Sequence, residues 1–143
     1  TVIAGKKASV LLAIEKLKNN GAKLAKLLDV SVPSHCSLMQ PAAFELEQLL
    51  NKTTFKAPSI PVIHNYSVQS YNSGTEIREA LVKQLVSPVR WVEVINYIYT
   101  LSIIDIYEFG PNSVLTKLCK RINPNVNCRS INTPDTLSSF NSD

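Results

Sequence analysis

Short runs of strand-forming residues alternate with helical apolar stripes along this chain of 143 residues. The clearest stripe lies in a helix predicted over residues 8–20, where Val10, Leu11, Ile14 and Leu17 fall at i, i+1, i+4 and i+7. The flanking residues 1–4 and 22–30 are predicted to be strands. Strands that are separated by helices usually lie parallel in one sheet, so the pattern predicts an α/β fold with a largely parallel sheet.

The rest of the chain continues this alternation. Strands are predicted at residues 62–64 and 103–109, and residues 66–75 are predicted to be a loop. Helices are predicted over residues 41–50, after a capping box at Ser73 and Glu76, after Ser87-Pro88, and after Asn112. The last two should bury Val92, Ile95, Ile98 and Tyr99, and Leu115, Leu118, Cys119 and Ile122. Residues 125–143 carry few apolar side chains and are predicted to be a poorly ordered tail.

Glycine spacing excludes several enzyme classes. The only glycines are Gly5, Gly21, Gly74 and Gly110, and the closest two lie 16 positions apart. The dinucleotide-binding fingerprint, the P-loop and the G-x-S-x-G nucleophile elbow all need glycines within a few residues of one another. None of these motifs can form within these 143 residues.

Composition indicates a globular chain from a reducing compartment. Hydrophobic residues make up 45%, charged residues 18%, and 15 Lys+Arg against 11 Asp+Glu give a net charge of +4. Cys36, Cys119 and Cys128 are odd in number and lack C-x-x-C spacing, which argues against a disulfide framework or a metal site. We find neither a transmembrane stretch nor a signal-peptide pattern, so a cytoplasmic location is expected.

Several motifs, in the same order along the chain, resemble one family. Residues 30–43 (VSVPSHCSLMQPAA) resemble the histidine segment of bacterial malonyl-CoA:acyl carrier protein transacylases. The resemblance continues through residues 57–62 (APSIPV), 77–85 (IREALVKQL), 87–91 (SPVRW), and 107–111 (YEFGP) with 114–116 (VLT). It extends from Val2 to about Ile122.

The resemblance implies the C-terminal part of such an enzyme. Residues 1–30 would end an inserted ferredoxin-like small subdomain, and residues 31–124 would belong to an α/β-hydrolase-like large domain. The family's nucleophilic serine and its malonyl-binding arginine lie upstream of the matching region. The implied partners are malonyl-CoA, acyl carrier protein and the N-terminal part of the same enzyme, with a coenzyme A thioester as substrate and no bound cofactor.

The resemblance also assigns two site residues. His35 would be the general base that activates the serine, a role that suits imidazole because its ordinary pKa is near ~6.5. The main-chain carbonyl of Gln84 would orient the other nitrogen of the His35 ring. From the residues alone, Gln84 could equally be a solvated helix residue. Cys36 is expected to have a packing role, and His64 a structural one.

Other interpretations stay open at this point. The chain could be a catalytically dead fragment, a module that only binds acyl carrier protein, or part of a polyketide synthase acyltransferase. Two basic clusters could be solvated faces or could steer an acidic carrier protein; they comprise Lys6, Lys7, Lys16, Lys18, Lys23 and Lys26, and Lys117, Lys120 and Arg121. Nucleic acid is not an expected partner, because aromatic residues are not interleaved with these lysines.

Overall fold

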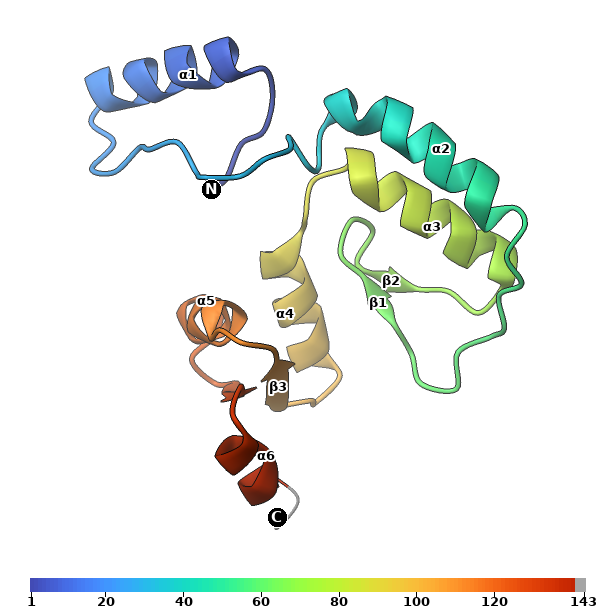
Figure 1. Cartoon of the computed structure of the whole chain (residues 1–143). Coiled ribbons are helices and arrows are strands. Elements are labelled where there is room, and N and C mark those ends of the chain that lie inside the picture. Colours follow the sequence, from blue (N-terminus) through green and yellow to red (C-terminus); the bar gives the residue numbers. More distant parts are fainter. Residues whose placement is uncertain (141–143) are drawn as a thin grey trace. The chain divides into compact units, whose positions relative to one another are not determined.

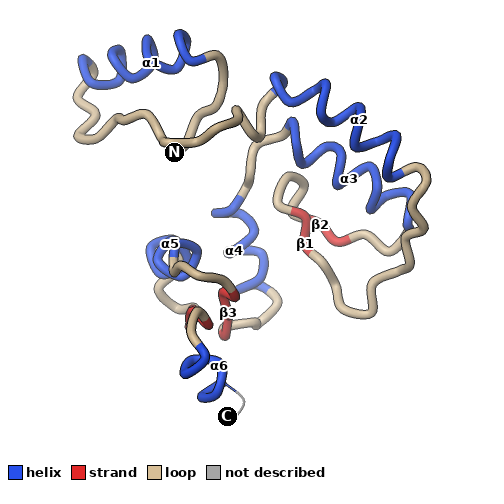
Figure 2. Tube along the Cα trace, in the orientation of Figure 1, coloured by secondary structure: helices blue, strands red, loops and turns tan. Residues whose placement is uncertain are grey.

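A computed structural model describes residues 1–140 and divides into two compact units, Thr1–Val89 and Arg90–Asp143. Figure 1 follows the chain through both units, and Figure 2 separates helices from strands. No helix within residues 1–140 is both long enough and apolar enough to cross a membrane. The subdomain boundary expected after Val30 stays a prediction.

The first unit is mostly helical. It contains α1 (Lys7–Asn19), the short 3-10 helix η1 (Ser37–Met39), α2 (Gln40–Leu50), β1 (Ile63–His64), β2 (Gln69–Ser70) and α3 (Gly74–Val86). Helices α2 and α3 pack side by side (Figure 1), and each buries one alanine completely, Ala43 and Ala80. The capping box at the start of α3 is confirmed: Ser73 Oγ accepts from the Glu76 amide at 3.2 Å, and Glu76 Oε2 from the Ser73 amide at 3.4 Å.

The strands predicted on either side of α1 are wrong. Residues 1–4 and 22–30 have no strand structure, and Val2 and Leu24 leave 76% and 78% of their surface exposed. A strand exists through hydrogen bonds to a neighbouring strand, and none of the strands in the described residues pairs with these segments. The loop predicted over residues 66–75 also needs correction, because β2 lies within it and pairs antiparallel with β1.

The second unit is built on a parallel strand pair. It contains α4 (Trp91–Thr100), β3 (Asp105–Phe109), α5 (Val114–Ile122), β4 (Asn127–Ile131) and α6 (Pro134–Phe140). Strands β3 and β4 pair in parallel from Asp105↔Asn127 to Phe109↔Ile131, with α5 as the crossover helix. This unit confirms the expected parallel pairing, although the described residues contain only two-stranded sheets.

The prediction of a poorly ordered tail over residues 125–143 is wrong where the structure describes it. Strand β4 and helix α6 both lie there, and the Phe140 ring contacts Tyr107 and Phe109 of β3 at centroid distances of 4.8 and 5.8 Å. The polar composition of β4 concealed it, because only Cys128 is fully buried along its length. Residues 141–143 of the predicted tail lie outside the described residues.

The core of the second unit centres on four buried side chains, with three partly buried ones packed against them. The buried four are Ile95, Cys119, Val126 and Cys128, and the others are Trp91, Ile106 and Ile122. The predicted faces of α4 and α5 are therefore right for Ile95 and Cys119. They are wrong for Val92, Tyr99, Leu115 and Leu118, which are exposed. Helix α4 also starts at Trp91 rather than at Pro88, because Ser87 is extended and ends α3.

Glu108, near the end of β3, holds the first turn of α5. Its carboxylate accepts hydrogen bonds from the Leu115 amide at 3.0 Å, and from the Thr116 amide and hydroxyl at 2.7 Å each. Amides in the first turn of a helix have no partner within the helix, so a carboxylate is well suited to them. Partial desolvation opposes ionisation, but these hydrogen bonds outweigh it and lower the pKa of Glu108.

We expect Glu108→Gln to destabilise the second unit in a pH-dependent way. A pKa that is lowered on folding contributes stability above the unfolded value of roughly 4.3, and this contribution is lost as pH falls through the folded value. The stability difference between the two proteins should therefore be largest near neutrality and should shrink in acid. Urea unfolding followed by fluorescence of the single tryptophan, Trp91, measures this. A difference that stays constant down to pH values well below the unfolded pKa would contradict it.

Candidate active site

His35 lies in a tight turn at residues 33–36, between α1 and α2. Its backbone φ is +64°, in the left-handed region that non-glycine residues seldom adopt. Such a conformation costs about 1–2 kcal/mol and persists where surrounding contacts impose it. The His35 backbone is therefore held in place by its neighbours.

The imidazole of His35 contacts the C-terminal end of α3. Its Nδ1 atom lies 3.0 Å from the main-chain oxygen of Gln84, 49 positions away in sequence. A carbonyl oxygen can only accept a hydrogen bond, so Nδ1 carries the proton in this contact. In the neutral ring Nε2 is then the free acceptor. The structure thus brings together the two predicted site residues in a tautomer that suits a base.

A second carbonyl of α3 holds the His35 backbone, and the sequence analysis missed it. The His35 amide donates to the Leu85 oxygen at 3.0 Å. Gln84 and Leu85 are among the last four residues of α3, whose carbonyls have no partner within the helix. One histidine thus uses two adjacent free acceptors. Backbone acceptors leave no signature in residue identity. The only signal in the sequence was the predicted end of a helix, where the last carbonyls lack partners.

A cavity of about 300 Å³ opens beside His35. Its apolar wall consists of four leucines from α2 and α3, namely Leu46, Leu50, Leu81 and Leu85, and Ser34, His35 and Gln84 complete the lining. The cavity places the histidine at the edge of an apolar surface. Within the described residues, no serine or carboxylate is hydrogen-bonded to the His35 ring.

Cys36 does not form a thiol–imidazole pair with its neighbour. Its Sγ donates instead to the Pro33 carbonyl at 3.1 Å. This contact gives Cys36 a definite role within the turn, which goes beyond the packing role expected from sequence. It also argues against a cysteine-protease arrangement, because that would require the sulfur to face the ring.

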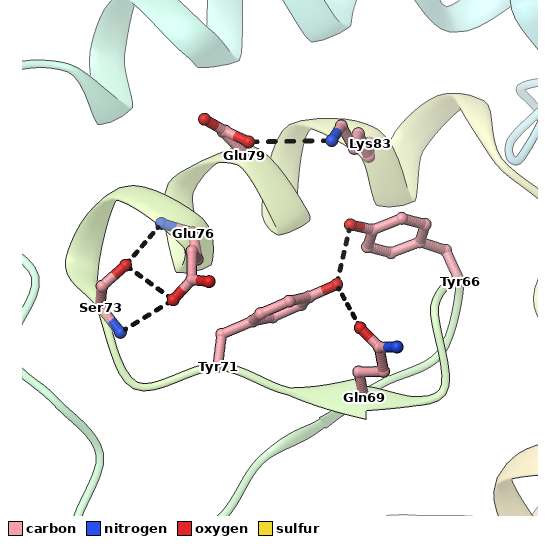
Figure 3. A network of polar contacts seen from close by, with 7 residues as sticks. All are labelled: Tyr66, Gln69, Tyr71, Ser73, Glu76, Glu79 and Lys83. Carbon is pink, nitrogen blue, oxygen red and sulfur yellow. Dashed lines mark hydrogen bonds and ion pairs between the residues drawn. The ribbon is translucent and has the colours of Figure 1, made fainter.

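The other polar cluster surrounds the β1–β2 hairpin. Figure 3 shows Tyr71 Oη between Tyr66 Oη, at 3.4 Å, and Gln69 Oε1, at 3.5 Å, with Ser73 and Glu76 of the capping box nearby. Burial and the hydrogen bond to Tyr71 raise the pKa of Tyr66 to about 12. Such a phenol stays protonated near neutrality, so we assign this cluster a structural role.

His64 belongs to the same hairpin. It is 6% exposed, its ring centroid lies 5.2 Å from that of Tyr71, and burial lowers its pKa. A buried, neutral histidine against an aromatic ring fits the structural role predicted for it. Across residues 1–140, no group of histidine, cysteine and acidic residues could hold a metal ion.

Comparisons with known proteins give this site a context. No family model matches the chain. The malonyl CoA-acyl carrier protein transacylase of Escherichia coli K12 is 44% identical over 137 residues, which are 96% of this chain and 44% of that protein. The chain is homologous to bacterial malonyl CoA-acyl carrier protein transacylases. It spans a little under half the length of these curated relatives.

Solved transacylase structures agree with this homology. The transacylase of Coxiella burnetii superimposes with a TM-score of 0.89 at 44% identity, covering 94% of this chain and 42% of that one. A malonyl-transacylase solved with a type II polyketide acyl-carrier protein gives 0.91 at 40% identity, covering 97% and 45%. The chain therefore has an α/β fold that matches part of a transacylase, while its assignment to a large domain and a small subdomain stays a prediction.

Proposed function

We propose that this chain is the C-terminal part of a malonyl-CoA:acyl carrier protein transacylase and supplies its general base, His35. The observation that carries the proposal is the 3.0 Å contact between His35 Nδ1 and the Gln84 carbonyl. It fixes the ring in the tautomer that leaves Nε2 free, beside an apolar cavity. The homology to transacylases supports it independently.

The reaction would proceed in two matched halves. As a serine oxygen from the remaining part of the enzyme attacks the malonyl thioester carbon, His35 Nε2 takes the serine proton. The tetrahedral intermediate collapses, the carbon–sulfur bond breaks, and the same proton goes to the departing coenzyme A sulfur. In the second half, His35 takes the proton of the pantetheine thiol of acyl carrier protein as its sulfur attacks the malonyl-serine ester carbon. The new carbon–sulfur bond forms, the bond from that carbon to the serine oxygen breaks, and the proton goes to the departing serine oxygen. No metal or redox cofactor takes part in these steps.

A main-chain carbonyl gives this base a different partner from that of a Ser-His-Asp triad. The Gln84 oxygen has no ionisable proton and no net charge, so it orients the ring without adding a titrating group. Because this acceptor belongs to the main chain, a substitution at position 84 that preserves the helix leaves it in place. The orientation of the His35 ring therefore depends on the conformation of the turn that carries His35 and on the position of the Gln84 carbonyl.

Intact-mass spectrometry tests the function directly. A completed enzyme, in which the N-terminal part of the Escherichia coli relative precedes Thr1, is measured before and after malonyl-CoA. We expect the mass of one malonyl group, which acyl carrier protein then removes. No gain in mass, with the chain folded, would favour a catalytically inactive piece or a carrier-binding module. Preference for another acyl group would favour the polyketide synthase alternative.

We propose acyl carrier protein as the macromolecular partner. The related malonyl-transacylase has been solved in complex with an acyl-carrier protein. In this chain Lys16 and Lys18 lie exposed in the last turn of α1, a helix without a buried residue. Acyl carrier proteins are acidic, so exposed lysines would attract them and raise the association rate. We place this reaction in the cytoplasm, where the three free thiols would stay reduced.

Charge reversal at α1 should affect the carrier protein selectively. We expect Lys16→Glu with Lys18→Glu to raise the KM of the completed enzyme for acyl carrier protein about 10-fold at low salt, and to leave the KM for malonyl-CoA unchanged. The effect should shrink as salt screens the charges. Lys52→Glu, an exposed lysine outside both basic clusters, is the matched control. Equal increases for both substrates would contradict a docking role, and the same test applies to Lys117 and Lys120.

A further inference from the structure

The turn that carries His35 is held from two directions. On one side, the carbonyls of Gln84 and Leu85 accept hydrogen bonds from the His35 ring and amide, each at 3.0 Å. On the other side, Cys36 Sγ donates to the Pro33 carbonyl at 3.1 Å and closes the turn on itself. His35, with its φ of +64°, lies between these two sets of contacts.

The position of His35 in the turn explains why the turn needs the hydrogen bond between Cys36 and Pro33. A four-residue turn with positive φ at its third residue normally has glycine or asparagine there. Histidine at this place relaxes toward negative φ unless the residues on both sides are fixed. Pro33 restricts the first position through its ring, and Cys36 fixes the fourth. The Cys36 carbonyl also accepts from the Met39 amide at 3.0 Å, which ties the turn to η1.

We propose that Cys36 is a positioning residue for His35, acting through the hydrogen bond from its thiol to the Pro33 carbonyl. The bond keeps the turn in the conformation that directs His35 Nδ1 at the Gln84 oxygen and so leaves Nε2 free. Cys36 does not react with substrate in this role. The catalytic meaning of the inference rests on the function proposed for His35, whereas its structural content does not.

Cys36 differs from the other two cysteines in a way that supports this role. Cys119 is fully buried in the core of the second unit, and Cys128 is 3% exposed there. Cys36 is only partly buried, in a loop, and its thiol is directed to a main-chain acceptor. A serine hydroxyl could replace this donor, whereas an alanine methyl could not. Serine and alanine at position 36 therefore form a matched pair that differs by one oxygen atom.

Nitrogen NMR of the two imidazoles in this chain tests the inference without catalysis. Above the pH range in which imidazole is protonated, the ring nitrogen shifts report which atom carries the proton. We expect the Nδ1–H tautomer of His35 to dominate in the unsubstituted chain and in Cys36→Ser, and to give way to a tautomer mixture in Cys36→Ala. Ser37→Ala, a change at the exposed neighbouring residue, should leave His35 unaffected.

His64 is the internal reference, because it lies in β1, against Tyr71, away from the turn. A change at His35 alone supports positioning. An unchanged His35 tautomer in Cys36→Ala overturns it, and so does a change at both histidines, which would make the thiol a general stabilising group. In the completed enzyme, Cys36→Ala should lower the transfer rate about 10- to 100-fold, with rescue by serine. If the unsubstituted completed enzyme transfers no malonyl group, the proposed function is refuted. The NMR result would still test whether Cys36 positions His35.

Discussion

Replacing His35 with alanine should lower the rate of serine acylation in the completed enzyme about 10²- to 10⁴-fold. This corresponds to about 3–5 kcal/mol of activation free energy. Without an imidazole, the serine proton has no acceptor as the oxygen attacks, and the coenzyme A sulfur has no donor as it leaves. Single-turnover acylation, quenched and followed by intact mass, measures the step itself. Because His35 is only partly buried in a surface turn, the substitution should leave the fold intact.

The matched control is Gln84→Ala. The main-chain oxygen of Gln84 accepts the hydrogen bond from the His35 ring, and alanine keeps that oxygen. Alanine also favours the helical conformation of α3, so the helix should persist. We therefore expect near-normal acylation in this variant. A loss comparable to that of His35→Ala would show that the glutamine side chain takes part, and near-normal acylation by His35→Ala itself would remove the histidine from the mechanism.

Sequence predicted secondary structure best where the side chains of residues close together in the chain determine it. The capping box at Ser73 and Glu76 predicted the start of α3, and the apolar stripe around Ile14 predicted α1 to within one residue. Both depend on interactions between residues close in sequence. The strand at Asp105–Phe109 was likewise recognisable from its β-rich composition, within two residues of its observed start.

Predictions that depended on distant partners were less successful. Residues 22–30 have the alternation of a strand, but no described strand lies beside them, and Leu24, Leu27 and Leu28 stay exposed. In β4, by contrast, pairing with β3 makes a strand from a polar sequence. Strand formation thus depends on a neighbour that local pattern does not reveal.

The site itself shows the same division. Residue chemistry alone left His35 an ordinary loop histidine, and the resemblance to a family directed attention to it and to Gln84. The contact that the structure adds is between a ring and a main-chain oxygen, and any residue at position 84 would offer that oxygen. The positive φ of His35 and the thiol contact of Cys36 depend on the turn conformation, which residue types alone do not specify.

The largest effect on stability is expected from Ile95→Ala. Ile95 is completely buried in α4, at the centre of the core that includes Cys119, Val126 and Cys128. Truncation removes buried methyl groups and leaves a cavity, which typically costs about 2–5 kcal/mol. Trp91 is the single tryptophan and packs against this core, so its fluorescence reports unfolding of the second unit in a denaturant titration.

Val92→Ala, one turn earlier on the same helix, provides the matched control. Val92 leaves 56% of its surface exposed, so truncation there removes little buried area. Alanine also has the higher helix propensity, so the free energy of unfolding should stay within about 0.5 kcal/mol of that of the unsubstituted chain. The pair separates the buried part of the predicted apolar face of α4 from its exposed part, because the sequence pattern assigned both residues to the buried face. Equal losses at the two positions would mean that α4 buries the face containing Val92 as well, and would contradict the core described above.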